Sequence, residues 1–272
     1  MTATPDSETK RQVSNPVSDA SEKSVSAVTG LVRDIVTDVF GLLDGLRSAV
    51  EALIRSREQE GVALLRQDLA VLRPDIEAVI RYGGRMVAGA GFVPAPGTLT
   101  DERMWLEWWV RSEEPEAVRR LLINLDPTSD HYVDFTRLPW YDTPMRTGRP
   151  HITGPYVDYV CTDEYSLTFT MPVGPTAGAG QGPLGVVGAD IYVSDLEPRL
   201  LPHLARMAAP ALLVNAQGRV VVSTTARHTT GSLIHHADLK TPKTAGSSPA
   251  PNVSGTLHRC GDAPLSLVVL GS

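Results

Sequence analysis

The sequence contains few cysteines and no excess of positive charge, and both features narrow the classes of protein it can encode. The 272 residues include two cysteines, Cys161 and Cys260, far apart in the chain. They lack the paired spacing of a zinc site or a redox dithiol, so we expect reduced thiols, no metal and no cofactor. The formal net charge is −6, from 25 Lys and Arg against 31 Asp and Glu, so we expect no nucleic-acid partner.

Long uncharged apolar runs are also scarce near the start of the sequence. Residues 1–24 are rich in Ser, Thr and charge, lack the apolar stretch of a signal peptide, and predict a disordered tail. The most apolar early stretch, Leu31 to Ile54, is interrupted by charges such as Asp34 and Asp38, which a hydrocarbon core rejects. We therefore expect a cytoplasmic protein with no membrane partner.

Residues 25–58 predict a long amphipathic helix. Gly41 and Gly45 lie one turn apart within it and would allow another helix to approach closely. The sequence leaves two interpretations open: the apolar stripe packs on this chain's own sheet, or it pairs with a second copy to form a homodimer. The stripe follows the spacing of three and four that marks one helix face, at Val32, Ile35, Val39, Leu42, Leu46, Ala49 and Leu53.

The rest of the chain predicts an α/β (α+β) protein with two sheet regions joined by a helix. The clearest strand is Tyr165 to Val173, in which apolar side chains alternate with Ser and Thr. Further strands are predicted over 106–111, 184–193, 211–215, 219–224 and twice within 256–270. Helices are predicted over 59–82, 114–125 and 195–207, and residues 240–254 predict a flexible loop.

A group of polar and aromatic residues between 132 and 190 suggests a binding site with two poles. An Arg beside a Tyr hydroxyl can hold a carboxylate, and two carboxylates beside aromatic rings can hold an ammonium group. Asp190 interrupts a strand whose other face is wholly apolar, although it could instead begin a loop or cap a helix. The candidate residues are Tyr132, Arg137, Trp140, Tyr141, Tyr156, Asp158 and Asp190.

The order of these residues carries a resemblance to a known family. The motifs are Tyr132…Arg137-Leu-Pro-Trp140-Tyr141, Gly148-Arg-Pro-His-Ile-Thr-Gly-Pro-Tyr156-Val-Asp158, Thr-Phe-Thr-Met-Pro-Val and Gly185-Val-Val-Gly-Ala-Asp190. Together they resemble the ligand-binding segment of the double Cache (dCache) sensor domains. In amino-acid-binding members a Tyr, an Arg and a Trp bind the ligand carboxylate, and a Tyr and two Asp bind its amine.

By position, the resemblance assigns the carboxylate to Tyr132, Arg137 and Trp140, with Tyr141 following the Trp. It assigns the amine to Tyr156, Asp158 and Asp190. The family has one residue between Arg and Trp, whereas Leu138-Pro139 intervene here, which shifts Trp140 relative to Arg137 and leaves open a ligand other than a plain α-amino acid.

The same resemblance implies the domain organisation. A long N-terminal helix would be followed by a PAS-like antiparallel sheet domain over residues 59–193, which binds the ligand. Residues 194–272 would form the connecting helix and a smaller, degenerate second PAS-like half, with the flexible loop near 240–254.

These features predict a small-molecule sensor that binds an amino-acid-like or amine/carboxylate metabolite and catalyses nothing. Its signal would pass to a separate protein, of which a transcription regulator is one example. A scaffold or dimerisation protein is the alternative. An enzyme using Asp158 and Asp190, or one of His131, His151, His235 and His236, is less favoured, because the sequence contains no nucleophile elbow, phosphate loop or dinucleotide fingerprint.

Overall fold

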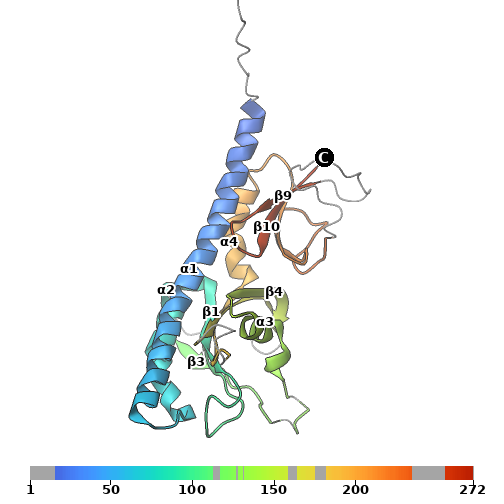
Figure 1. Cartoon of the computed structure of the whole chain (residues 1–272). Helices are drawn as coiled ribbons and strands as arrows, with labels where there is room; N and C mark the ends of the chain where they lie inside the picture. Colours follow the sequence, from blue (N-terminus) through green and yellow to red (C-terminus); the bar gives the residue numbers. More distant parts are fainter. Residues whose placement is uncertain are drawn as a thin grey trace, which may run out of the picture.

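The computed structural model describes residues 16–112, 117–126, 128–130, 132–158, 164–174, 182–234 and 255–271. One long helix, α1, runs beside two antiparallel sheets that follow one another along its length (Figure 1). The helix α4 lies next to α1 and joins the sheets in sequence. The predicted α+β class, with a long leading helix and two sheet regions, is therefore confirmed.

Helix α1 spans Pro16–Glu60 and begins earlier than predicted, so that residues 16–24 are helical instead of part of a disordered tail. The predicted tail before residue 16 lies outside the described residues. Along the helix, Val32, Val39 and Leu46 are buried against this chain's own sheets, which supports the first of the two interpretations of the stripe. Another face remains exposed, and it includes Gly41 and Gly45.

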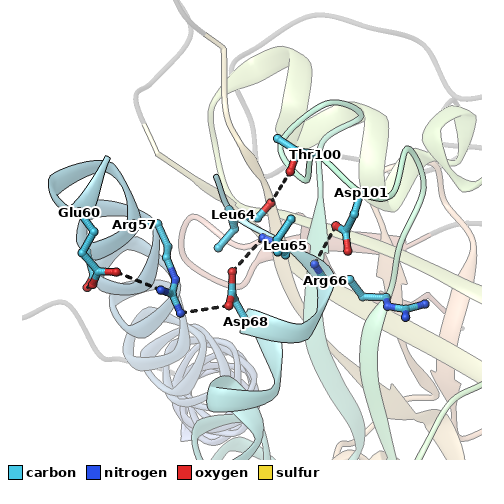
Figure 2. A network of polar contacts seen from close by, with 9 residues as sticks. Arg57, Glu60, Leu64, Leu65, Arg66, Asp68, Thr100 and Asp101 are labelled. Atoms are coloured by element: carbon cyan, nitrogen blue, oxygen red, sulfur yellow. Dashed lines mark hydrogen bonds and ion pairs between the residues drawn. The ribbon is translucent and has the colours of Figure 1, made fainter. Parts of the chain in front are cut away.

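The chain turns at Gly61 and continues as a short 3-10 helix, η1 (Arg66–Leu72), followed by α2 (Arg73–Tyr82). The helix predicted over 59–82 is therefore divided, and Pro74 lies in the first turn of α2, where its missing N–H costs nothing. Figure 2 shows how this junction is fixed: Arg57 of α1 forms an ion pair of 3.0 Å with Asp68 of η1, which also accepts the backbone N–H of Leu65.

The same junction is attached to the loop that follows the first strand. The Thr100 hydroxyl donates to the Leu64 carbonyl over 3.4 Å, and the N–H of Arg66 donates to Asp101 over 2.9 Å (Figure 2). The Arg66 guanidinium also lies over the ring of Trp105. These contacts hold the end of α1 against the first sheet.

The first sheet has six strands in the order β3-β2-β1-β6-β5-β4, and each strand is antiparallel to its neighbours. Its strands are β1 (Val87–Pro94), β2 (Glu107–Arg111), β3 (Val118–Arg120), β4 (His151–Asp158), β5 (Glu164–Val173) and β6 (Gly185–Tyr192). Its short helices are η2 (Gly84–Met86), η3 (Phe135–Arg137) and α3 (Pro139–Thr147).

The helix predicted over 114–125 is wrong where the structure describes it. Val118 to Arg120 instead form β3, whose residues pair with β2 in the register Arg111 to Val118 and Trp109 to Arg120. Pairing with a neighbouring strand overrides the local helical preference of this segment.

The alternation along β5 and β6 separates the two faces of the first sheet. Leu167, Phe169 and Ile191 face α1 and α4 and belong to the main apolar core. The intervening residues of the two strands, among them Thr168 and Asp190, point to the other face. The predicted separation into an apolar and a hydroxylated face is therefore confirmed, although the hydroxylated face is buried as well.

Helix α4 (Val193–Leu204) leads to the second sheet, with strand order β8-β7-β10-β9. The strands are β7 (Ala211–Asn215), β8 (Val220–Ser223), β9 (Gly255–Arg259) and β10 (Leu265–Leu270), so the predicted hairpin and the two closing strands are present. The second sheet is smaller than the first, as predicted, while the loop near 240–254 lies outside the described residues. Its inner face shares one continuous apolar core with the first sheet.

Candidate ligand-binding site

A cavity lies on the polar face of the first sheet. Its volume of about 500 Å³ is within the range of small-molecule binding sites. The sheet and its margin supply the floor: Leu106, Trp108, Tyr156, Asp158, Thr168 and Asp190. The chain between β3 and α3, together with the start of α3, supplies the cover: Leu121, Leu122, Ile123, Asn124, Asp130, Tyr132, Val133, Phe135, Leu138 and Trp140.

A chain of hydrogen bonds crosses three strands of the floor. Thr168 and Asp190 are directly opposite one another on β5 and β6, and the Thr168 hydroxyl donates to Asp190 Oδ1 over 2.6 Å. The Tyr156 hydroxyl of β4 lies 2.6 Å from Thr168 Oγ1. Because Thr168 has one proton and gives it to Asp190, Tyr156 is the donor in that second bond. The position of each of the three polar groups therefore depends on the next.

Two carboxyl groups are buried at this site with little solvent contact. Asp158 is 7% exposed and Asp190 is 8% exposed. Burial raises the pKa of Asp190 to about 7, the hydrogen bond from Thr168 opposes that rise, and the nearby charge of Asp158 adds to it. The cavity therefore contains a carboxyl group that changes its charge close to neutral pH.

An aromatic wall borders these carboxyl groups. The rings of Trp108 and Trp140 lie 6.5 Å apart, and Phe135 stacks on Trp140 at 6.0 Å. Gly188 of β6 makes room for this wall, because a Cβ there would lie 2.9 Å from the Trp108 ring. The Trp108 indole N–H slightly lowers the pKa of Asp190, but it makes no hydrogen bond of ordinary geometry with any described residue.

The structure brings five of the seven predicted residues to the cavity: Tyr132, Trp140, Tyr156, Asp158 and Asp190. Tyr141 instead points into the apolar cluster behind the wall, where burial raises its pKa to about 12 and its hydroxyl has no partner among the described residues. Arg137 lies outside the cavity lining, with its side chain 86% exposed and Nε 3.1 Å from Asp134. The predicted carboxylate pole is therefore not assembled around Arg137.

Leu138 and Pro139 account for the separation of Arg137 from Trp140. The 3-10 helix η3 ends at Arg137, Leu138 is extended with φ −76° and ψ 141°, and Pro139 begins α3. The two short helices therefore meet at a bend. Trp140 enters the cavity from α3, whereas Arg137 pairs with Asp134 within its own turn.

Sequence reasoning missed Trp108, Thr168 and the apolar cover as components of the site. Thr168 could have been found, because it alternates with the apolar residues of β5 and so shares a face with the polar residues of its neighbours. Trp108 gave no such signal, since an aromatic residue in a strand is commonly core. The cover has no regular periodicity and depends on the path of the loop.

The charges of the cavity are of one sign. Asp130, Asp158 and Asp190 line it, and none of its described lining residues is Lys, Arg or His. His151 lies on β4 outside that lining, and burial lowers its pKa. The other histidines considered from the sequence, His131, His235 and His236, lie outside the described residues. The described lining therefore favours a positively charged guest.

Comparisons with known proteins give similarity in structure only, since no known family's sequence profile and no curated protein sequence matches the chain. A solved structure of the ligand-binding domain of the Pseudomonas aeruginosa amino acid chemoreceptor PctC, in complex with GABA, has a TM-score of 0.55 at 19% identity. The match covers 94% of this chain and 100% of that one. The ligand-binding domain of the Pseudomonas fluorescens chemoreceptor CtaA, in complex with L-valine, has a TM-score of 0.58 at 14% identity. That match covers 93% of this chain and 96% of the other.

The periplasmic sensory domain of the Campylobacter jejuni chemoreceptor Tlp1 is also similar, with a TM-score of 0.63 at 10% identity over 93% of this chain and 94% of that one. The prediction of a cytoplasmic protein is corrected by these neighbours, since this one is described as periplasmic and another as an extracellular domain. None of the described helices is long and apolar enough to cross a membrane.

The similarity extends over nearly the whole chain and includes both sheets and the long helix. At identities below 20% it establishes the fold and leaves the ligand to be argued from the cavity. The chain has the PAS-like double-Cache fold of chemoreceptor ligand-binding domains, as the sequence resemblance implied.

Proposed function

We propose that this chain is a sensor domain that binds a small molecule through a protonated amino group held by Asp158 and Asp190. The observation that carries the proposal is the pair of buried carboxyl groups in a cavity whose described lining has no basic residue. A buried anion is costly unless a cation or hydrogen-bond donors compensate it, and an ammonium group supplies both. Trp108 and Trp140 add ring faces that attract a cation.

The signal would leave the cavity through the first sheet and α1. The strands that carry Thr168 and Asp190 pack their opposite faces on α1, where the rings of Phe40 and Phe169 meet edge to face at 5.4 Å. A ligand that draws these strands together changes the surface on which α1 rests. The size of that change is limited by the difference in the ligand's affinity for the two states.

The output surface is proposed to be α1 itself. Gly41 and Gly45 have no atoms within 4 Å of where a Cβ would stand, and this open stripe suits a second copy of the chain or a signalling partner. A transcription regulator, the partner named as an example from the sequence, is not proposed, because such a protein acts inside the cytoplasm. With a fold whose neighbours include a periplasmic sensory domain, the proposed setting is outside the cytoplasm.

An enzymatic role for Asp158 and Asp190 is not proposed. Both carboxyl groups serve the proposed binding role, and the neighbouring structures are described as ligand-binding and sensory domains. A purely scaffolding role leaves the burial of two carboxyl groups beside a cavity without a purpose.

Thermal unfolding against a panel of primary amines and amino acids at pH 8 tests the proposal. A bound amine should raise the melting temperature, and the Asp190→Asn variant should lose at least about 100-fold in affinity, as for removal of one charge from a buried ion pair. Asp38→Asn, on the exposed side of α1, is the matched control and should bind normally. Absence of any shift, or normal binding by Asp190→Asn, would contradict the proposal.

A further inference from the structure

The negative charges and the apolar surface of the cavity come from different parts of the chain. The floor contributes Asp158 and Asp190 from β4 and β6, whereas the cover contributes the side chains of Leu121, Leu122 and Ile123. Further apolar cover residues are Val133 and Leu138. A guest that meets both parts has one cationic group and an apolar body.

The group that would hold a second, anionic end of a guest is engaged elsewhere. Arg137 pairs with Asp134 Oδ2, and Asp134 is itself fixed because its other oxygen, Oδ1, accepts the backbone N–H and the hydroxyl of Thr136. Drawing Arg137 into the cavity would break its pair and leave Asp134 without its cation. The turn around η3 therefore places the guanidinium on the solvent side, where its side chain is 86% exposed.

A carboxylate inside the cavity would meet only like charges among the described lining residues. Asp130, Asp158 and Asp190 are all acidic, so a carboxylate would be repelled by these groups, and only neutral donors such as the Tyr132 hydroxyl and the Trp108 indole N–H would replace its lost hydration. An amine with the same side chain carries no carboxylate, so neither the lost hydration of a carboxylate nor its repulsion from the acidic groups opposes binding. The cavity therefore discriminates between ligands in two ways: it binds an ammonium group, and it excludes a carboxylate.

We propose that the cavity selects amines that lack a carboxylate and carry an apolar body, and that it rejects the amino acids with the same side chain. This inference rests on the proposed function and narrows it, because it names the class of ligand. It also separates the chain from its structural neighbours PctC and CtaA, whose bound ligands, GABA and L-valine, carry a carboxylate as well as an amine.

Two matched pairs of compounds test the selectivity: 3-methylbutylamine with leucine, and 2-phenylethylamine with phenylalanine, which differ only in the carboxylate. Calorimetry on the whole chain at pH 8 should show at least one amine binding more than about 30-fold more tightly than its amino acid. Arg137→Ala should leave both affinities of that pair unchanged. Equal binding of amine and amino acid, or a loss of about tenfold or more for the amino acid of that pair in Arg137→Ala, would overturn the inference.

A gain of function provides the converse test. Leu138→Arg places a guanidinium at a residue that lines the cavity, and the amino acids should then gain at least about tenfold in affinity relative to their amines. Leu138→Gln, which adds length without charge, is the matched control and should keep the preference for amines. No change in preference for Leu138→Arg would count against the exclusion of carboxylates by charge.

The results separate this inference from the proposed function. If amino acids bind as well as amines and Asp190→Asn abolishes both, the amine site stands and the exclusion of carboxylates fails. If no amine in the panel binds, both proposals fail together.

Discussion

The two sheets of this molecule share the long helix but differ in what they bury. Among the described residues, every buried polar or charged side chain belongs to the first sheet: Glu107, Asp158, Ser166, Thr168, Thr170 and Asp190. The central strands of the second sheet bury apolar side chains on both faces, with Leu213 and Leu267 toward α1 and Leu212 and Val268 toward the outer cluster. The first sheet therefore carries the buried polar groups of the proposed site, whereas the described part of the second sheet contributes only apolar side chains to the core.

Burying polar side chains in the first sheet and apolar side chains in the second has different effects on the free energy of unfolding. Burial of apolar side chains contributes about 25 cal/mol for each Å² removed from water, whereas burial of polar groups costs free energy that their hydrogen bonds only partly recover. Glu107 shows the recovery at its most complete, since its carboxylate accepts the indole N–H groups of Trp105 and Trp109 and pairs with Arg120. Asp190 has fewer donors and titrates near neutrality instead.

The largest expected effect is a pH dependence of the free energy of unfolding that comes from Asp190, in the polar first sheet. Because the pKa of Asp190 is raised to about 7 in the folded state, the folded chain keeps a proton that the unfolded chain loses above about pH 4. The contribution of Asp190 to the free energy of unfolding should therefore fall as pH rises from about 4 to 7, by up to roughly 4 kcal/mol, and then level off.

Urea unfolding of the wild-type chain and of Asp190→Asn across this pH range measures that contribution as a difference. Subtraction removes the contributions of distant groups, so that the difference reports Asp190 together with its interaction with Asp158. Parallel stability curves for the two proteins would show that Asp190 titrates as an ordinary carboxyl group. The same proton makes amine binding weaken below about pH 7, since the cation must displace it.

The next largest effect concerns the second sheet. Leu213 is 1% exposed and lies in the core shared with α1, so Leu213→Ala should lower the free energy of unfolding by about 3 kcal/mol. Affinity for the amine, measured below the melting temperature, should change less than about twofold, because the residue is not part of the cavity lining. Leu233→Ala, at a site 54% exposed in the same half, is the control for stability. A large loss of affinity in Leu213→Ala would show that the second sheet also contributes to ligand binding, and would contradict the proposed difference between the two sheets.

The smallest effect concerns a side-chain hydrogen bond between the two sheets, from Asn215 Nδ2 to the Gly154 carbonyl over 2.6 Å. Asn215 Oδ1 also accepts the N–H groups of Gln217 and Arg219, which fixes the turn of the β7–β8 hairpin. Asn215→Asp keeps that acceptor and loses the donor. It should cost about 1 kcal/mol in stability and, because Tyr156 lies just after Gly154, about three- to tenfold in amine affinity.

Calorimetry and urea unfolding of Asn215→Asp measure both quantities, with Gln217→Ala as a control that leaves the bond intact. A loss of stability with unchanged affinity would mean that the hairpin supports the fold without positioning the cavity.

Much of this organisation could be predicted from periodicity alone. The apolar stripe on α1 and the alternation on β5 depend on local sequence. The alternation on β6 likewise places Asp190 on the face opposite to the apolar Ala189 and Ile191. The position of β3 could not be predicted, since Val118 to Arg120 become a strand only by pairing with β2. For Arg137, the intervening Leu138-Pro139 indicated a shift relative to Trp140, but the direction of the Arg137 side chain depends on how η3 and α3 meet around Leu138 and could not be predicted.

The continuity of α1 has a mechanical consequence. A helix of 45 residues is about 67 Å long, and its backbone hydrogen bonds make it stiff along its axis. Phe40 meets the first sheet, whereas Arg33, two turns earlier, lies beside the turn at Gly261 between β9 and β10, where a Cβ added to Gly261 would stand 3.3 Å from the Arg33 side chain. A shift of the strands beneath Phe40 is therefore carried to the far sheet as the displacement of a solid rod, without any hinge in between to absorb it.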